Sequence, residues 1–279
     1  MTTRDGKVAR APRSSRLHAM MCDVERTFEQ LVAEAASVSV AGWDFSWLDG
    51  RATEQRPSWG YQRLLRARLP EVGSALDIYT GGGEVLAGAG PVFPPTMAAT
   101  EPWPPNIALA TQLLHPLGVV VVATKGDELP LPFADAAFDL VCSRHPSAVW
   151  WDEIARLLKP GGTYFAQHVG VIYLRTLIEY FAGAQPERRI RGQLDPDTVR
   201  AEVGAAGLDV VDLRHEQIRL EFFDIGAVIY FLRKLDWVVP GFAVENYRDK
   251  LLKLHQQIEA DGAFVTHTSR VLIEAHKPR

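Results

Sequence analysis

Cysteine is scarce in this sequence: Cys22 and Cys142 are its only two, and neither belongs to a C-x-x-C pair. A disulfide framework or a zinc ribbon requires more cysteines at closer spacing, so both are excluded. Clusters of His and Cys are missing as well, and we expect no bound metal. This cysteine usage is typical of the reducing cytoplasm, where we expect the protein to reside.

Long apolar runs are missing too. No stretch approaches the ~18 consecutive apolar residues of a transmembrane helix. The basic residues near the N-terminus are not followed by the apolar segment of a secretory signal. We therefore expect no membrane partner, and we interpret residues 1–14 as a disordered basic arm.

A strong excess of charge of either sign is absent. The formal net charge is −4 and the pI is near 6.1. This balance gives no general attraction to a polyphosphate backbone, so a nucleic-acid partner is disfavoured. Hydrophobic residues make up 47% and charged residues 23% of the chain, which predicts a soluble protein with a well-buried core.

Several motifs of familiar enzyme classes are also missing. The pattern G-x-x-x-x-G-K-[ST] does not occur, nor do G-x-S-x-G or H-E-x-x-H. These absences argue against a P-loop for ATP or GTP, a serine nucleophile elbow and a zinc protease site. The dinucleotide pattern G-x-G-x-x-G fails because Leu86 stands where its third glycine would fall. An NAD enzyme is therefore disfavoured.

After Gly73 the sequence alternates between short strands and helices. Strands are expected at 74–78, 96–100, 118–123, 137–143, 162–168, 208–221 and 264–275, and helices at 83–88, 105–115 and 148–158. Such alternation predicts an α/β fold with a doubly wound, mostly parallel sheet, here of seven strands.

Helical segments flank this alternation on both sides. Residues 15–72 are expected to form an N-terminal helical cap, with one helix from Leu17 to Ala35 and another over 57–69. Residues 73–279 form the main domain, in which 222–262 is a helical insertion before the last strand. Its aromatic residues, with Phe222 and Phe223 before Tyr230 and Phe231, either cover a bound ligand as a lid or pack in the core.

A glycine turn follows the first strand of the main domain, in "LDIYTGGGE". Gly81, Gly82 and Gly83 occupy the position where ligands of such sheets bind, and glycine permits positive φ and close backbone approach. With Asp77 at the strand end, the pattern is D-x-Y-x-G-x-G. It resembles the D-x-G-x-G-x-G pattern of class I S-adenosylmethionine-dependent methyltransferases, which have a Rossmann-like fold.

The resemblance continues along the central region. Glu101 in "MAATEPWPPN" matches the acidic residue that accepts hydrogen bonds from the ribose hydroxyls in this family, and Asp127 in "KGDELPLPF" matches the acid near the adenine amino group. "LPF…FDLV" and "RLLKPGGTYF" match later family segments. The motifs are similar to those of the ubiquinone and menaquinone biosynthesis group, whose members often act on small molecules.

Two further cofactor contacts are implied, each with an alternative. Trp103 is expected to cover the adenine face or to pack in the core. Arg144 is expected to hold an acidic group of cofactor or substrate, or to form a surface salt bridge.

Tyr79 departs from the family pattern because it stands where the first glycine is usual. Its phenol ring must turn outward, stack nearby or occupy part of the cofactor site. The last outcome would make the protein a non-catalytic homologue that binds a cofactor or partner through a degraded site.

The resemblance implies methyl transfer from S-adenosylmethionine, with S-adenosylhomocysteine as product and a small organic molecule as acceptor. An RNA-base methyltransferase is the second hypothesis. His145 and His168 end strands on the ligand side, so each is a candidate base, substrate contact or structural histidine. The sequence does not indicate the atom methylated or the oligomeric state.

Overall fold

The computed structural model describes residues 26–42, 44–90, 92–126, 128–184 and 192–279. Its strands are β1 (Ala52–Glu54), β2 (Ser74–Ile78), β3 (Thr96–Glu101), β4 (Val120–Ala123), β5 (Phe138–Arg144), β6 (Leu158–Tyr173), β7 (Asp209–Phe222) and β8 (Phe264–His276). Its α-helices are α1 (Phe28–Ser37), α2 (Tyr61–Arg68), α3 (Glu84–Ala89), α4 (Pro104–Leu114), α5 (Trp151–Leu157), α6 (Arg175–Ala182), α7 (Val199–Ala205), α8 (Ile225–Lys234) and α9 (Val244–Asp261).

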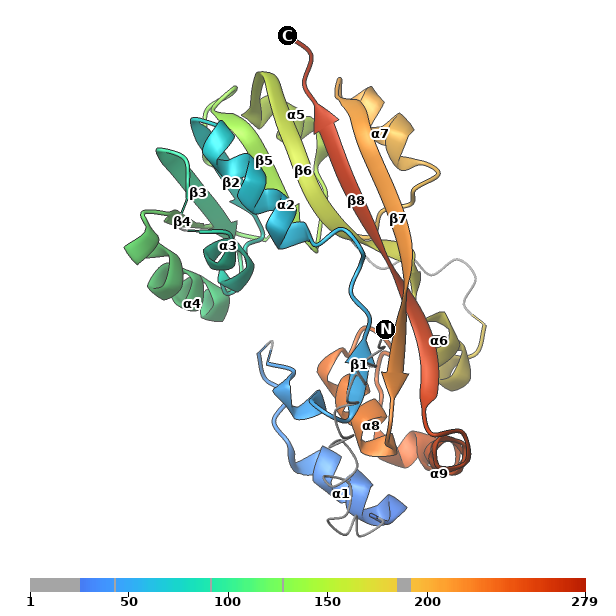
Figure 1. The fold of residues 1–279 in the computed structure, drawn as a ribbon. Helices are drawn as coiled ribbons and strands as arrows, with labels where there is room; N and C mark the ends of the chain where they lie inside the picture. Colours follow the sequence, from blue (N-terminus) through green and yellow to red (C-terminus); the bar gives the residue numbers. More distant parts are fainter. Residues whose placement is uncertain (1–25, 43, 91, 127, 185–191) are drawn as a thin grey trace, which may run out of the picture.

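The strands of the described residues form one eight-stranded sheet in the order β1-β7-β8-β6-β5-β2-β3-β4 (Figure 1). The central strands, from β4 to β6, are parallel, whereas β8 is antiparallel to both of its neighbours. The predicted doubly wound, mostly parallel α/β fold is confirmed. The strand number differs because β1, which was not predicted, pairs with the far end of β7, where Ala52 lies opposite Phe222.

Helices cover both faces of the parallel part of the sheet (Figure 1). Leu76 and Ile78 pack with residues of α5 and α7, whereas Ala75 packs with residues of α2, α3 and α4. Every residue of β2 is buried, as expected for a parallel strand covered on both faces. This burial fixes the end of β2, from which the glycine turn projects.

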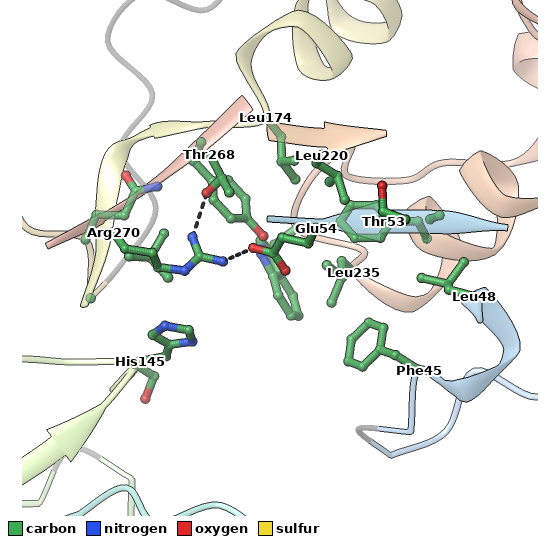
Figure 2. A pocket seen from close by; sticks show the side chains of 18 of the residues that line it. Phe45, Leu48, Thr53, Glu54, His145, Leu174, Leu220, Leu235, Thr268 and Arg270 are labelled. Carbon is green, nitrogen blue, oxygen red and sulfur yellow. Dashed lines mark hydrogen bonds and ion pairs between the residues drawn. The ribbon is translucent and has the colours of Figure 1, made fainter. Parts of the chain in front are cut away.

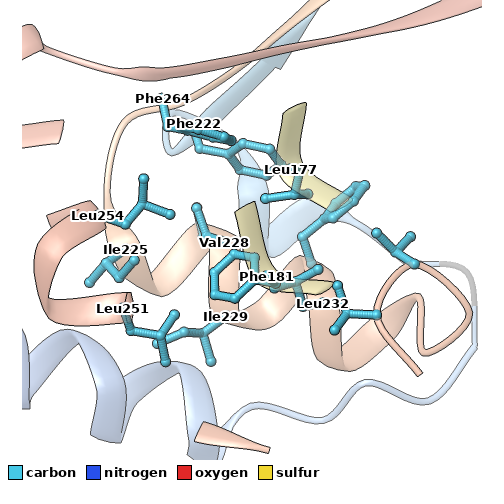
Figure 3. Close-up of a cluster of buried hydrophobic side chains, with 14 of the residues drawn as sticks. Leu177, Phe181, Phe222, Ile225, Val228, Ile229, Leu232, Leu251, Leu254 and Phe264 are labelled. Carbon is cyan, nitrogen blue, oxygen red and sulfur yellow. The ribbon is translucent and has the colours of Figure 1, made fainter. Parts of the chain in front are cut away.

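A second group of helices lies beyond the parallel strands. The long strands β7 and β8 extend to it, and it contains α1, α6, α8 and α9 (Figure 1). Leu177, Phe222, Val228 and Leu254 share its apolar core (Figure 3). Leu31 of α1 belongs to the same core. We call α1, α6, α8, α9 and β1 the cap. The first expected N-terminal helix and the late insertion are therefore one packing unit around α8, which is buried along most of its length. The second expected helix, α2, packs on the parallel part of the sheet instead.

An ionic network joins the two chain segments of the cap. Arg51, which is 9% exposed, donates from Nε and Nη2 to the carboxylate of Asp224, each at 2.8 Å. Arg51 also pairs with Glu34 at 3.0 Å. Asp224 accepts the Ala227 backbone N–H at 2.9 Å and so caps α8. A bidentate arginine pair of this kind fixes orientation as well as contact.

Several element boundaries differ from the prediction. The expected helix from Leu17 begins at Phe28, because Thr27 and Gln30 form a capping box there. The second helix begins at Tyr61, after Gly60 in the left-handed region at φ 63°. Strand β6 is longer than predicted, and α6 was not predicted.

Residues 1–14, the helix positions from 17 to 25 and Asp127 lie outside the described residues. No helix within the described ranges is long and apolar enough to cross a membrane.

Candidate functional site

The glycine turn after β2 depends on two glycines with positive φ. Gly81 has φ 66° and Gly83 has φ 88°. A Cβ on Gly83 would lie 2.9 Å from Leu114 Cγ and 3.3 Å from Ala110 Cα of α4, whereas one on Gly81 would meet nothing within 4 Å. Gly83 is therefore required for conformation and packing together, and Gly81 for conformation.

Glu101, at the end of β3, is held against this turn. Its Oε2 accepts the Gly81 backbone N–H at 2.9 Å, and its Oε1 accepts the Trp103 backbone N–H at 3.1 Å. The Asn106 amide also donates to Oε1, at 3.4 Å. The residue is 4% exposed, and burial raises the pKa of its carboxyl. The carboxylate retains lone pairs for further donors, such as a pair of ribose hydroxyls.

Asp77 is a second buried carboxyl beside the turn. It is 7% exposed and accepts a hydrogen bond from the Cys142 thiol, with 3.4 Å between Sγ and Oδ1. Burial raises the pKa of Asp77 to about 6. The charged form is therefore costly in the ligand-free protein, and a cationic group bound nearby would favour it.

These groups line a cavity of about 1010 Å³, which we call the loop cavity. Among the predicted residues, it is lined by Asp77, Tyr79, Gly81, Gly82, Glu101, Trp103, Arg144 and His145. Gly83 supports the turn from behind. The structure thus brings together nearly every cofactor residue that the sequence suggested. The salt bridge that was the alternative role for Arg144 is not observed, since no described residue forms a side-chain hydrogen bond or ion pair with it.

Tyr79 adopts the left-handed backbone that a glycine would adopt at this position, with φ 59°. Its ring lies 5.5 Å from that of Trp150, and its hydroxyl donates to the Gly126 carbonyl at 3.4 Å. The ring therefore packs against the loop after β4 and forms part of the cavity wall. Of the three expected placements, contact with a neighbouring ring is the one observed, with the planes of Tyr79 and Trp150 tilted by 32°.

Replacing Tyr79 by glycine is expected to change S-adenosylhomocysteine affinity by less than about threefold, because the ring is held against Trp150. The unfolding free energy should change by less than about 1 kcal/mol, since relief of left-handed strain of ~1–2 kcal/mol offsets the lost ring contact. Calorimetry and urea denaturation measure the two quantities. A tenfold gain in affinity would instead mean that the ring obstructs the site.

Two polar side-chain atoms of the loop cavity have no hydrogen-bond partner. Tyr61 Oη and Lys234 Nζ line this cavity, and both are buried without a hydrogen-bond partner in the described structure. Buried polar atoms are normally satisfied. S-adenosylmethionine offers a carboxylate, an ammonium, a sulfonium and two ribose hydroxyls, so its groups match these atoms and the carboxyls of Asp77 and Glu101. The residues present fit this cofactor.

His145 lies at the end of β5 and is part of a buried hydrogen-bond chain. The Trp59 indole N–H donates to Gln167 Oε1 at 2.7 Å, which leaves the Gln167 amide nitrogen to donate to His145 Nε2 at 2.8 Å. The proton of neutral His145 is then on Nδ1. Burial and the charges of Arg144 and Arg270 hold the pKa of His145 well below its usual value.

These contacts make His145 a neutral N–H donor. Its lone pair is engaged by Gln167, so this arrangement argues against its use as a general base.

His168 is placed differently from the prediction. It is 0% exposed, lines neither cavity, and lies with Nε2 at 2.9 Å from the Tyr164 hydroxyl. Burial lowers the pKa of His168 to about 3. The structure therefore separates His168 from the site and favours a structural role for it.

A second cavity, of about 870 Å³, lies between the sheet and the cap, and we call it the cap cavity (Figure 2). It shares His145, Ser147 and Trp237 with the loop cavity. Its apolar wall includes Phe45, Leu48, Leu174, Leu220, Phe231 and Leu235. Phe231 thus contributes to a cavity as the lid hypothesis required, whereas Phe222 is packed in the cap core.

No local signal in the sequence indicated four residues that line these cavities or contact their walls: Gln167, Lys234, Glu54 and Arg270. Gln167 is next to His168, but its partner Trp59 is 108 residues away. Lys234 ends a helix whose apolar residues indicated only packing. Glu54 and Arg270, which pair in the cap cavity, are 216 residues apart. Among the described residues, no group of three or more His, Cys, Asp or Glu could hold a metal ion.

The raised pKa of Asp77 predicts a pH dependence. Native Asp77 keeps its proton up to about pH 6, whereas the unfolded residue releases it near 3.8. The native state therefore binds more protons between these values, so this group's contribution to stability falls as pH rises through the interval, by at most about 3 kcal/mol.

The Asp77→Asn variant lacks this titration. The difference in unfolding free energy, variant minus parent, should grow from pH 4 to pH 7 in denaturation measurements of ligand-free protein. Cofactor affinity of the parent should rise over the same interval. Parallel stability curves for the two proteins would contradict the assigned pKa.

Comparisons with known proteins agree with this geometry. Residues 76–166 match a family model described as "Methyltransferase domain". A Bacillus halodurans protein to which methyltransferase activity is ascribed has 16% identity and a TM-score of 0.52, over 78% of this chain and 99% of that one. The YcgJ protein of Bacillus subtilis has 15% identity and a TM-score of 0.52, over 78% and 98%.

A functionally unknown protein from Deinococcus radiodurans has 16% identity and a TM-score of 0.53, over 81% of this chain and 90% of that one. At these identities the structural matches show the fold. No protein of curated function matches the chain.

The fold and the glycine turn, with an acid at the end of each adjoining strand, are those of the class I S-adenosylmethionine-dependent methyltransferases. Residues 76–166 are a methyltransferase domain.

Proposed function

We propose that this methyltransferase acts on a small organic molecule that binds in the cap cavity. The observation that carries the proposal is the shared wall: the cap cavity and the loop cavity meet at His145, Ser147 and Trp237. An acceptor in one cavity would therefore adjoin a cofactor in the other.

The dimensions and chemistry of the cap cavity support this proposal. Its volume of about 870 Å³ falls within the ~300–1,000 Å³ of small-molecule sites. Its wall is mostly apolar, with a few charged groups that include Glu54 and Arg270. Such a cavity suits a molecule with an apolar body and one polar end.

S-adenosylmethionine, when bound, supplies a methyl group already activated by its sulfonium. The chain therefore has to bind the cofactor and the acceptor, orient them toward each other and exclude water. Glu101 would accept the ribose hydroxyls, and the turn at Gly81 and Gly82 would let the backbone approach the cofactor. Asp77 would offset its positive charge. Trp103, which is 39% exposed, would cover the adenine.

An RNA acceptor has less support. The formal net charge is −4, and the acceptor cavity is lined by apolar side chains from the cap. We therefore place the RNA-base hypothesis second.

The proposal is tested with S-adenosylmethionine labelled in its methyl group and a panel of small apolar acids, phenols and amines. Acceptor-dependent formation of S-adenosylhomocysteine is expected, and the Ala52→Phe variant should abolish it, because Ala52 lines the cap cavity. S-adenosylhomocysteine affinity, which reports the loop cavity, should be unchanged in this variant. Turnover with RNA but with no small molecule would contradict the proposal.

A further inference from the structure

The cap cavity contains a buried arginine whose hydrogen-bonding capacity is only partly used. Arg270, on β8, is 9% exposed. Its Nη1 donates to Thr268 Oγ1 at 2.8 Å and to the Ser269 carbonyl at 3.0 Å, and its Nη2 donates to Glu54. A guanidinium has five N–H donors. The Nε–H and one Nη2–H thus have no partner among the described residues.

His145 adds a further unused donor close to this arginine. The hydrogen-bond chain through Gln167 puts the His145 proton on Nδ1, and no described residue accepts from it. Figure 2 shows the His145 ring facing the same part of the cap cavity as the Arg270 guanidinium. Unused N–H donors from β5 and β8 therefore converge on one end of an otherwise apolar cavity.

Charged groups of both signs surround these donors. Arg144 and Arg270 both act on His145, and each disfavours its protonated form. Glu54 pairs with Arg270, and Asp49 also lines the cap cavity, whereas Arg144 lines the loop cavity and has no ion pair with any described residue. An anion at this end of the cap cavity would meet the unused N–H groups of Arg270, with the unpaired charge of Arg144 next to His145.

We propose that the methyl acceptor carries a carboxylate, which binds the unused N–H donors of Arg270 and the Nδ1–H of His145, while its apolar body fills the cap cavity. This inference rests on the proposed function. The planar fork of arginine matches a carboxylate, and hydrogen bonds of this charged kind are the strong ones. An amine would need Glu54, whose carboxylate already accepts from Arg270.

The test uses three probes of one shape with different ends: 4-phenylbutyrate, 4-phenylbutyramide and 4-phenylbutylamine. Each is titrated into the full chain by calorimetry, with and without saturating S-adenosylhomocysteine. The variants are Arg270→Lys, which keeps the charge but loses the fork, and His145→Asn, since asparagine tolerates the observed φ of 55°. Arg214→Gln, on the exposed face of β7, is the control for loss of positive charge.

The proposal predicts that the acid binds at least tenfold more tightly than the amide and that the amine binds most weakly. Arg270→Lys should weaken binding of the acid at least tenfold, and His145→Asn should weaken it at least threefold. Arg214→Gln should bind the acid like the parent, and all three variants should keep the parent's affinity for S-adenosylhomocysteine. Equal binding of acid and amide, no binding of the acid at millimolar concentration, or an acid affinity unaffected by Arg270→Lys would each overturn it. Failure of S-adenosylhomocysteine to bind would instead contradict the proposed function.

Discussion

Replacing Glu101 by alanine is expected to weaken S-adenosylhomocysteine binding at least 100-fold, the largest loss of affinity that we predict for a single side chain. The variant removes the charged acceptor for two ribose hydroxyls, and a hydrogen bond to a charged group contributes ~1.5–3 kcal/mol. It also releases the Gly81 and Trp103 backbone N–H groups that this carboxylate holds in place. A 100-fold loss corresponds to about 2.7 kcal/mol.

Glu101→Gln separates the two effects. The amide keeps the shape and one acceptor oxygen, so the turn should persist while affinity falls less than in the alanine variant. Glu128→Ala, an exposed acid after β4, is the control and should bind like the parent. Unchanged affinity of Glu101→Ala in calorimetry would remove Glu101 from the cofactor site.

The largest loss of stability is expected from Gly83→Ala, about 2–5 kcal/mol in unfolding free energy. Alanine at φ 88° carries the left-handed strain of ~1–2 kcal/mol. Its Cβ also overlaps Leu114 and approaches the backbone of Ala110, and overpacking of this kind costs ~1–3 kcal/mol. The α4 backbone cannot yield as a flexible side chain would, so both costs remain.

Gly81→Ala is the matched control for this variant. Its φ of 66° imposes a similar strain, but its Cβ meets nothing within 4 Å. We expect a loss of only ~1–2 kcal/mol in urea denaturation. The difference between the two variants measures the packing of the turn against α4, and equal losses would show that this packing contributes nothing.

Features that depend on a few adjacent residues were predicted most accurately from the sequence. The end of β2, the glycine turn and Glu101 are specified by short segments, because an apolar run and a glycine-rich turn are patterns of adjacent residues. The strand β2 was predicted at its observed bounds. The same locality explains why most of the predicted cofactor residues line one cavity.

The cap and the acceptor end of the site could not be predicted in this way. β1 is only three residues long, and its place follows from pairing with β7. Arg270 and Glu54 meet because two distant strands extend beyond the sheet core. A place near the end of a strand did not suffice to predict a role for His168. Strand alternation turns its side chain into the core, whereas His145 faces the cavities.

We expect the glycine turn after β2 to bind S-adenosylmethionine despite Tyr79. The decisive measurement is calorimetric titration of the unmodified chain with S-adenosylmethionine and with S-adenosylhomocysteine. One site per chain is expected, with a dissociation constant in the micromolar range for both molecules. Absence of binding at millimolar concentration, in a protein whose cooperative unfolding shows it to be folded, would contradict this expectation.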